Sequence, residues 1–322
     1  MAARLQTAAN EGEEMARIAI VGCGAMGSVY AALMASAGHD VYGITLWEAH
    51  AEAMNRHGLR VEGASGDRTV AVRGSTTTDG IGPCDLVIIA TKAYDVEQAA
   101  RSALPLLGPH TTVQAVQNGL GSDARVAAIV GAGRVAVGVV GGFGASLRGP
   151  GHAHHNGMEM VRFGAFAGLP WPALEDSARP WQSAGFTVRL FRDIRQMVWE
   201  KLILNVAFSG TACLTGLTIG EIMANPHAWS VARACAEEAV AVARAAGITL
   251  DVGDPIAHIR HLGGRIAGAR PSALLDHLAQ RRSEIDVING AIPRTGQPLG
   301  IAAPVNDAVV ALVKLREQGF GS

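Results

Sequence analysis

Residues 17–38 read RIAIVGCGAMGSVYAALMASAG, and this stretch decides the fold of the first half of the chain. An apolar run at 18–21 stops at a glycine, and the residues that follow repeat their apolar positions at helical spacing, which predicts a strand, a tight turn and a helix. The turn has the G-x-G-x-x-G spacing of a dinucleotide site, in which the helix N-terminus faces the phosphates. The residues expected at the cofactor are Gly22, Gly24, Ala25, Met26 and Gly27.

The length and charge of the chain narrow the classes of protein to which it belongs. A chain of 322 residues favours two domains, and 27 basic against 28 acidic residues give a net charge of −1. This balance argues against nucleic-acid binding and against an anionic membrane as partner. Apolar stretches such as 202–217 are too short and too polar to span a bilayer, and four scattered cysteines favour neither a disulfide framework nor zinc.

The first fourteen residues resemble neither a signal peptide nor a transit peptide. We expect a disordered tail over 1–14, and Met15, just before the first strand, is an alternative translation start. The sequence therefore predicts a cytoplasmic protein.

Further strands are expected at 41–46, 86–90 and 111–116, and 86–90 is a fully apolar run of the kind that forms a central parallel strand. Ligands of such sheets bind beyond the carboxyl ends of the strands, where Lys92 and Asn118 follow two of these runs. The alternative interpretation of Lys92 is an ordinary solvent-exposed loop residue. For Asn118 and the glycine that follows it, the alternative is an ordinary turn. Residues 45–48, at the end of the second strand and just after it, are Thr-Leu-Trp-Glu. They include no arginine that could bind the 2′-phosphate of NADP, and their one carboxylate comes slightly after the strand end where NAD sites bind the ribose. The sequence therefore leaves both NADP and NAD possible as the cofactor.

Between these strands the sequence is less regular. A helix is expected over 51–57 and a strand near 69–72. His152, His154 and His155 lie in a polar, glycine-rich stretch without a neighbouring carboxylate or cysteine. We therefore expect them to be exposed to solvent and to hold no metal.

From about residue 193 the pattern changes to helical periodicity, which predicts a Rossmann-type α/β domain over 15–192 and an all-helical domain over 193–322. Helices are expected at 194–208, 228–246, 272–280 and 304–317. Lys201 and Asn205 are four apart and share one helix face, near the boundary where a two-domain dehydrogenase needs its acid. Further on, Ser272 has the position of a helix cap, and the stretch 283–286 resembles a capping box in which Glu284 favours the helix dipole.

Taken in order, these motifs resemble the ketopantoate reductase family over about 17–315. The motifs are the glycine fingerprint, Thr91-Lys92, Gln117-Asn118-Gly119, W-E-K-L-I-L-N around Lys201, and the block at 272–290. The resemblance implies NADPH-dependent reduction of 2-dehydropantoate to pantoate, a step of pantothenate biosynthesis. It implies that Lys201 is the general acid, that Asn118 and Glu284 are catalytic residues that also meet the cofactor, and that Lys92 lies near the cofactor. The positions it assigns to the substrate are Asn205, Ser209 and Ser272.

Two departures from the family pattern leave the cofactor and the substrate open. Ser209 stands where the family often has a second asparagine, and Leu46 or Trp47 stands where it has an arginine for the 2′-phosphate. The alternatives are a reductase of the same fold acting on another 2-oxo acid, and an NADP-binding sensor without turnover, for which Lys201 and Glu284 would have no use. The alanine-rich helices at 228–246 and 304–317 are also compatible with a homodimer.

Overall fold

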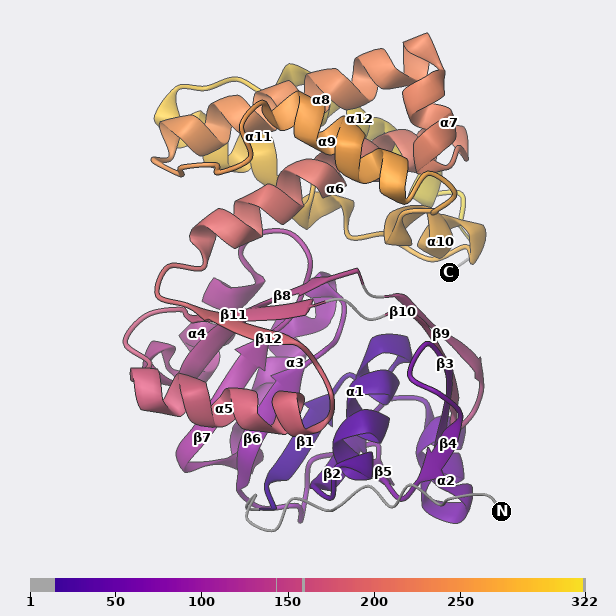
Figure 1. The fold of residues 1–322 in the computed structure, drawn as a ribbon, viewed down its shortest axis with the longest axis vertical. Coiled ribbons are helices and arrows are strands. Elements are labelled where there is room, and N and C mark those ends of the chain that lie inside the picture. The colour runs from indigo at the N-terminus through magenta and orange to yellow at the C-terminus, as the bar shows by residue number, and fades with distance from the viewer. Residues whose placement is uncertain (1–14, 143, 158–159, 321–322) are drawn as a thin grey trace, which may run out of the picture.

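The computed structural model describes residues 15–142, 144–157 and 160–320, so the expected tail at 1–14 lies outside the described residues. Figure 1 shows an α/β region at one end of the molecule and a group of helices stacked on it, with α6 (Arg195–Thr215) between them. The α/β region followed by helices is the predicted fold class. The helix expected at 194–208 is thus confirmed, and it continues to Thr215.

An eight-stranded sheet forms the centre of the α/β region, in the order β12-β11-β8-β7-β6-β1-β2-β5. Strands β5, β2, β1, β6, β7 and β8 are parallel, whereas β11 runs antiparallel to β8. The bounds are β1 (Arg17–Val21), β2 (Asp40–Ile44), β5 (Arg73–Ser75), β6 (Cys84–Ile89), β7 (Leu107–Ala115), β8 (Val135–Gly141), β11 (Met160–Ala165) and β12 (Val188–Phe191). The expected parallel strands are all present, and their carboxyl ends meet at one edge.

Both faces of this sheet are buried, which explains why residues 18–21 of β1 and 86–89 of β6 are continuous apolar runs. In β1, Ile18 and Ile20 belong to the hydrophobic cluster on one face, whereas Ala19 and Val21 belong to the cluster on the other. The helices that cover the sheet are α1 (Ala25–Ser36), α2 (Glu48–His57), α3 (Val96–Ser102), α4 (Ser122–Val130) and α5 (Trp171–Ser183).

A second sheet of four strands packs against α1, and the sequence did not reveal it. It contains β3 (Leu59–Gly63), β4 (Arg68–Val70), β9 (Gly144–Gly149) and β10 (His152–Gly157), of which β4 overlaps the strand expected near 69–72. The expectation of an exposed histidine loop is wrong, because the three histidines lie on β10 and His155 is fully buried. Glu62, from the neighbouring strand β3, lies 3.2 Å from His152 Nε2 and 3.4 Å from His154 Nδ1.

The helical region has one hydrophobic core, formed around α6 and α8 (Pro226–Ala245). Its other helices are α7 (Ile219–Ala224), α9 (Pro255–Arg265), α10 (Ser272–Leu278), α11 (Ala291–Gly296) and α12 (Pro304–Glu317). The expected helices at 228–246, 272–280 and 304–317 correspond to α8, α10 and α12. No helix in the described part of the chain is long and apolar enough to cross a membrane.

Candidate active site

The three glycines of the fingerprint meet three different surroundings. Gly22 has a φ of +95°, and a Cβ there would lie 2.5 Å from the backbone nitrogen of Thr91. A Cβ on Gly27 would lie 2.6 Å from the carbonyl oxygen of Gly22, so α1 packs closely against the turn. By contrast, a Cβ on Gly24 would meet no atom closer than 4.0 Å. The protein's own packing therefore explains the first and third glycines, and leaves the second facing open space.

That open face fits a dinucleotide. Gly24 is the N-cap of α1, and no side chain among the described residues caps this helix. The amides of Ala25, Met26 and Gly27 form the first turn, where a helix leaves its N–H groups unpaired and favours negative charge. A phosphate that approaches the bare Cα of Gly24 would satisfy these donors. The start of α1 is thus uncapped and open at Gly24, and the binding of a pyrophosphate there stays a prediction.

The loops after β6 and β7 lie side by side at the carboxyl edge of the sheet. The Gln117 side-chain amide donates hydrogen bonds to the carbonyl oxygens of Ile89 (2.6 Å) and Thr91 (3.2 Å). This contact fastens the Gln117-Asn118-Gly119 loop to the Thr91-Lys92 loop. Two motifs about 25 residues apart in the sequence are therefore one surface in the structure.

Gly119 joins this surface to the helical region. Its φ is +81°, and a Cβ there would lie 2.1 Å from the carbonyl oxygen of Val287. That same oxygen accepts a hydrogen bond of 2.9 Å from the backbone N–H of Leu120. Any side chain at position 119 would push the two regions apart. Glycine is therefore required both by the close contact with the Val287 carbonyl oxygen and by the positive φ.

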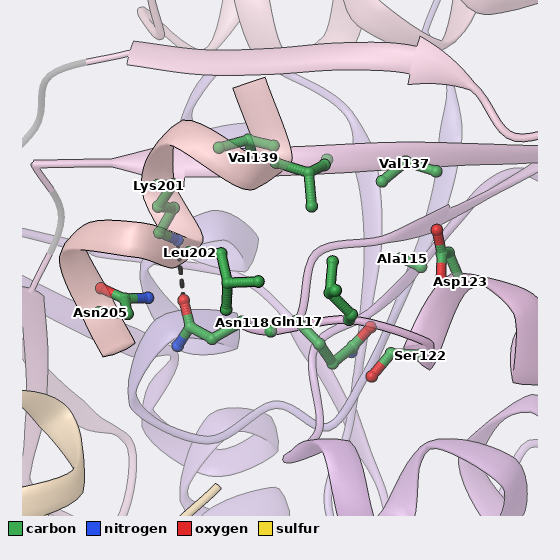
Figure 2. Close-up of a pocket in the computed structure, with 14 residues that line it drawn as sticks. Ala115, Gln117, Asn118, Ser122, Asp123, Val137, Val139, Lys201, Leu202 and Asn205 are labelled. Atoms are coloured by element: carbon green, nitrogen blue, oxygen red, sulfur yellow. Dashed lines mark hydrogen bonds between the residues drawn. The ribbon is translucent and has the colours of Figure 1, made fainter. Parts of the chain in front are cut away.

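Lys201, Asn118 and Glu284 meet across the boundary between the two regions. The ammonium Nζ of Lys201 donates to the side-chain oxygen of Asn118 at 2.7 Å, as Figure 2 shows. The Asn118 amide in turn donates to Glu284 Oε2 at 3.5 Å. Glu284 is only 6% exposed, and its other oxygen accepts the backbone N–H of Ala93 at 2.9 Å. Asn118 therefore links the amine to a buried carboxylate.

This environment changes the acidity of Lys201. Withdrawal of the amine from water is the largest cause and lowers its pKa to about 8, whereas the negative charge of Glu284 raises the pKa and the positive charge of Arg162 lowers it. An amine with such a pKa keeps a large protonated fraction near neutral pH and releases a proton far more readily than an ordinary lysine. Lys201 is thus suited to proton donation.

A small cavity lies beside this amine. Its apolar lining includes Val137, Val139 and Leu202. Its polar lining comprises Lys201, Asn118, Asn205, Gln117, Ser122 and the carboxylate of Asp123. Figure 2 shows Asn205 on α6 together with Lys201, which is one turn earlier on the same face. Apolar walls with a few convergent polar groups are typical of a pocket for a small organic ligand.

The other two positions assigned to the substrate lie away from this cavity. Ser209, one turn after Asn205, is buried inside the helical region and is 3% exposed. Ser272 is the exposed first residue of α10, and no side-chain cap is formed there. Neither serine is among the residues that line the cavity.

Lys92 lies at the same edge and pairs with a residue that the sequence reasoning missed. Its Nζ is 2.5 Å from Asp276 Oδ2 and 3.8 Å from Glu284 Oε2, while Asp276 is 4% exposed. Asp276 falls among the buried residues of α10, next to Leu274 and His277. A carboxylate at a buried helical position was the signal that could have identified it, because such groups are rarely buried unless paired.

The capping box expected at 283–286 is not formed. The Ser283 hydroxyl donates to Glu317 Oε1 at 2.6 Å, and its backbone N–H donates to the same oxygen at 2.8 Å. Glu284 precedes a single 3-10 turn, Ile285–Val287, and points to the α/β region instead of serving a helix dipole. The long-range contacts override the local capping pattern.

Comparison with known proteins gives matches over both regions of the chain. The family model "Ketopantoate reductase PanE/ApbA" matches residues 18–168, and the model of its C-terminal domain matches 193–317. A 2-dehydropantoate 2-reductase of Archaeoglobus fulgidus is 31% identical over 304 residues, which cover 94% of this chain and 99% of the relative.

Two solved structures have the same architecture. A PanE/ApbA family ketopantoate reductase from Ralstonia eutropha is 32% identical with a TM-score of 0.86, over 94% of this chain and 98% of that one. D-mandelate dehydrogenase, in a ternary structure with NADH and anilino(oxo)acetate, is 26% identical with a TM-score of 0.88, over 94% of this chain and 99% of that one. Fold, motifs and relatives agree, and the chain belongs to the ketopantoate reductase PanE/ApbA family as a 2-dehydropantoate 2-reductase-like oxidoreductase.

Proposed function

We propose that this protein reduces the carbonyl group of a 2-oxo acid with a nicotinamide dinucleotide, and that 2-dehydropantoate is the substrate. The observation that supports the proposal most directly is the contact of Lys201 with Asn118 and, through it, with Glu284, at the sheet edge that carries the glycine loop. The family supports the reaction class, and the relative from Archaeoglobus fulgidus, a 2-dehydropantoate 2-reductase, supports the substrate. NADPH is the donor that the resemblance implies, and NADH presents the same nicotinamide ring.

The chemistry requires a proton at the carbonyl oxygen. The reduced nicotinamide, when bound, supplies the hydride to C2, and negative charge then builds up on the oxygen of that carbonyl. The Lys201 ammonium, which donates to Asn118 beside the cavity, stabilises this charge and donates the proton. Asn118 holds the amine in place, and Glu284 accepts a hydrogen bond from Asn118 and opposes the lowering of the amine's pKa by burial.

Asn205 supplies the amide that a substrate hydroxyl or carboxylate needs at the cavity wall. Ser209 and Ser272 are proposed as substrate residues only through the family pattern. A 2-oxo acid other than 2-dehydropantoate is a second candidate, because D-mandelate dehydrogenase, with a similar fold, was solved with an oxo acid that carries an aromatic ring.

The test is initial-rate oxidation of NADH and of NADPH with 2-dehydropantoate and a panel of other 2-oxo acids, including phenylglyoxylate. Rapid oxidation with 2-dehydropantoate in preference to the panel supports the proposal. Preference for another 2-oxo acid replaces the substrate and keeps the mechanism. Cofactor binding without oxidation in any mixture would favour the sensor and contradict the proposal.

A further inference from the structure

The end of β2 lies directly against the glycine loop. The carbonyl oxygen of Ile44 accepts hydrogen bonds from the backbone N–H groups of Gly22 (3.0 Å) and Cys23 (2.7 Å). Residues 45–48 therefore start beside the loop that faces the pyrophosphate. In dinucleotide-binding folds this position contacts the 2′ position of the adenosine ribose, where NADH has a hydroxyl and NADPH a phosphate.

Buried contacts hold this turn in one arrangement. His50 is fully buried, and its Nδ1 accepts the backbone N–H of Gly151 at 2.8 Å, so in the neutral ring Nε2 carries the proton and donates it to Ser28 Oγ at 3.0 Å. The ring also stacks on Trp47, with 5.5 Å between centroids and 9° between planes. The turn is thus anchored to α1, which carries Ser28, while Leu46 stays 87% exposed.

The cations on the elements around this turn are engaged elsewhere. On β5, the neighbour of β2, Arg73 lies 3.1 Å from Asp40, the first residue of β2, and so belongs to the opposite edge of the sheet. Arg56 pairs with Glu52 at the far end of α2. Lys92, on the other side of β1, pairs with Asp276.

The charge of the turn itself is negative. None of the described residues 45–48 is basic, and Glu48 begins α2 with an exposed side chain. A carboxylate accepts hydrogen bonds from ribose hydroxyls, whereas it repels a phosphate that finds no cation beside it. The distribution of charge therefore discriminates between the two cofactors.

We propose that this protein binds NADH in preference to NADPH, with Glu48 as the residue that accepts the adenosine ribose hydroxyls. The inference rests on the proposed function, because it assumes that the glycine loop holds a nicotinamide dinucleotide. The family resemblance implies NADPH, whereas the residues of this turn favour NADH.

The experiment is a calorimetric titration of the full chain with NADH and with NADPH in the absence of any 2-oxo acid, so that the readout is Kd and does not depend on turnover. We expect NADH to bind at least about tenfold more tightly, a ratio in the range that one charged contact provides. Equal or tighter binding of NADPH would overturn the inference and leave the reductase proposal intact. Binding of neither cofactor would overturn both.

Three variants locate the effect. Leu46→Arg adds a cation at an exposed position of the turn and should tighten NADPH binding about tenfold or more with little change for NADH. Glu48→Gln should weaken NADH binding several-fold and leave NADPH binding unchanged or tighter. Glu52→Gln, one turn further along α2, is the matched control. It should change neither Kd, because Arg56, whose ion pair it breaks, lies at the far end of α2 from the turn. An equal effect of Glu48→Gln and Glu52→Gln on NADH binding would contradict the role of Glu48.

Discussion

The two halves of the site are built in different ways. The glycine loop comes from one continuous stretch, in which strand, turn and helix follow each other within twenty-two residues. The proton-donating half is assembled from three distant segments, because Lys201 lies 83 positions from Asn118, and Glu284 lies 166 positions from it. The first half depends on local backbone geometry, and the second depends on how the helical region rests on the sheet.

The largest effect is expected at the assembled half. Lys201→Ala removes the proton donor and should lower kcat by about two to four orders of magnitude, the usual contribution of general acid catalysis. The Kd for the cofactor should stay within a few-fold of wild type, because the glycine loop is untouched. Steady-state kinetics and calorimetry measure the two quantities. An unchanged kcat would remove Lys201 from the mechanism.

A methyl group added where the α/β region meets the helical region tests whether the contacts of Lys201, Asn118 and Glu284 require the close approach of these two regions. In Gly119→Ala the new Cβ meets the Val287 carbonyl oxygen in a backbone conformation that alanine rarely adopts, and we expect a loss of about 2–4 kcal/mol in unfolding free energy together with most of the activity. Denaturant unfolding and kcat/KM report the two losses.

The matched control for this prediction lies in the glycine loop. Gly24→Ala places its methyl group in open space, so the melting temperature should hardly change while cofactor affinity falls. Equal stability losses in Gly24→Ala and Gly119→Ala would contradict the distinction between a glycine that serves the ligand and one that serves the protein.

Asp276→Asn tests the ion pair between Lys92 and Asp276, which lies next to Glu284. The variant keeps the shape of the side chain but removes the charge that Lys92 contacts, so the amine is left with Glu284 as its charged partner. We expect a loss of about 1–3 kcal/mol in unfolding free energy and a decrease in kcat/KM, because Glu284 is drawn away from Asn118.

The control is Asp176→Asn, which removes one partner of an exposed pair with Arg179 and should cost less than about 1 kcal/mol. If the two variants lose the same stability, the Lys92 pair contributes no more than a surface contact.

The same division explains what could be predicted from the sequence. The strand, turn and helix around Gly22 are encoded by spacing alone, and so are the long helices. Asp276 and the second sheet were missed because their roles depend on partners far away in the chain, such as Lys92 for Asp276 and β3 for β10. The capping box predicted at 283–286 was wrong for the same reason, because Ser283 donates its hydrogen bonds to the distant Glu317.

Family resemblance supplied the roles of Lys201, Asn118 and Glu284, which local patterns could not. The structure adds the hydrogen bonds that connect these three side chains.

The most direct test of the account is the pH dependence of kcat/KM, which reports the ionisation of the free enzyme, measured for the wild type and for Glu284→Gln. A lysine that must be protonated, with a pKa of about 8 in the free enzyme, predicts a kcat/KM that is constant below about pH 7 and falls about tenfold per pH unit above 8. Because the Glu284 charge raises that pKa, the variant should lose activity at lower pH than the wild type. A wild-type rate that stays constant up to pH 10, or a variant with an unshifted profile, would contradict Lys201 as the proton donor tuned by Glu284.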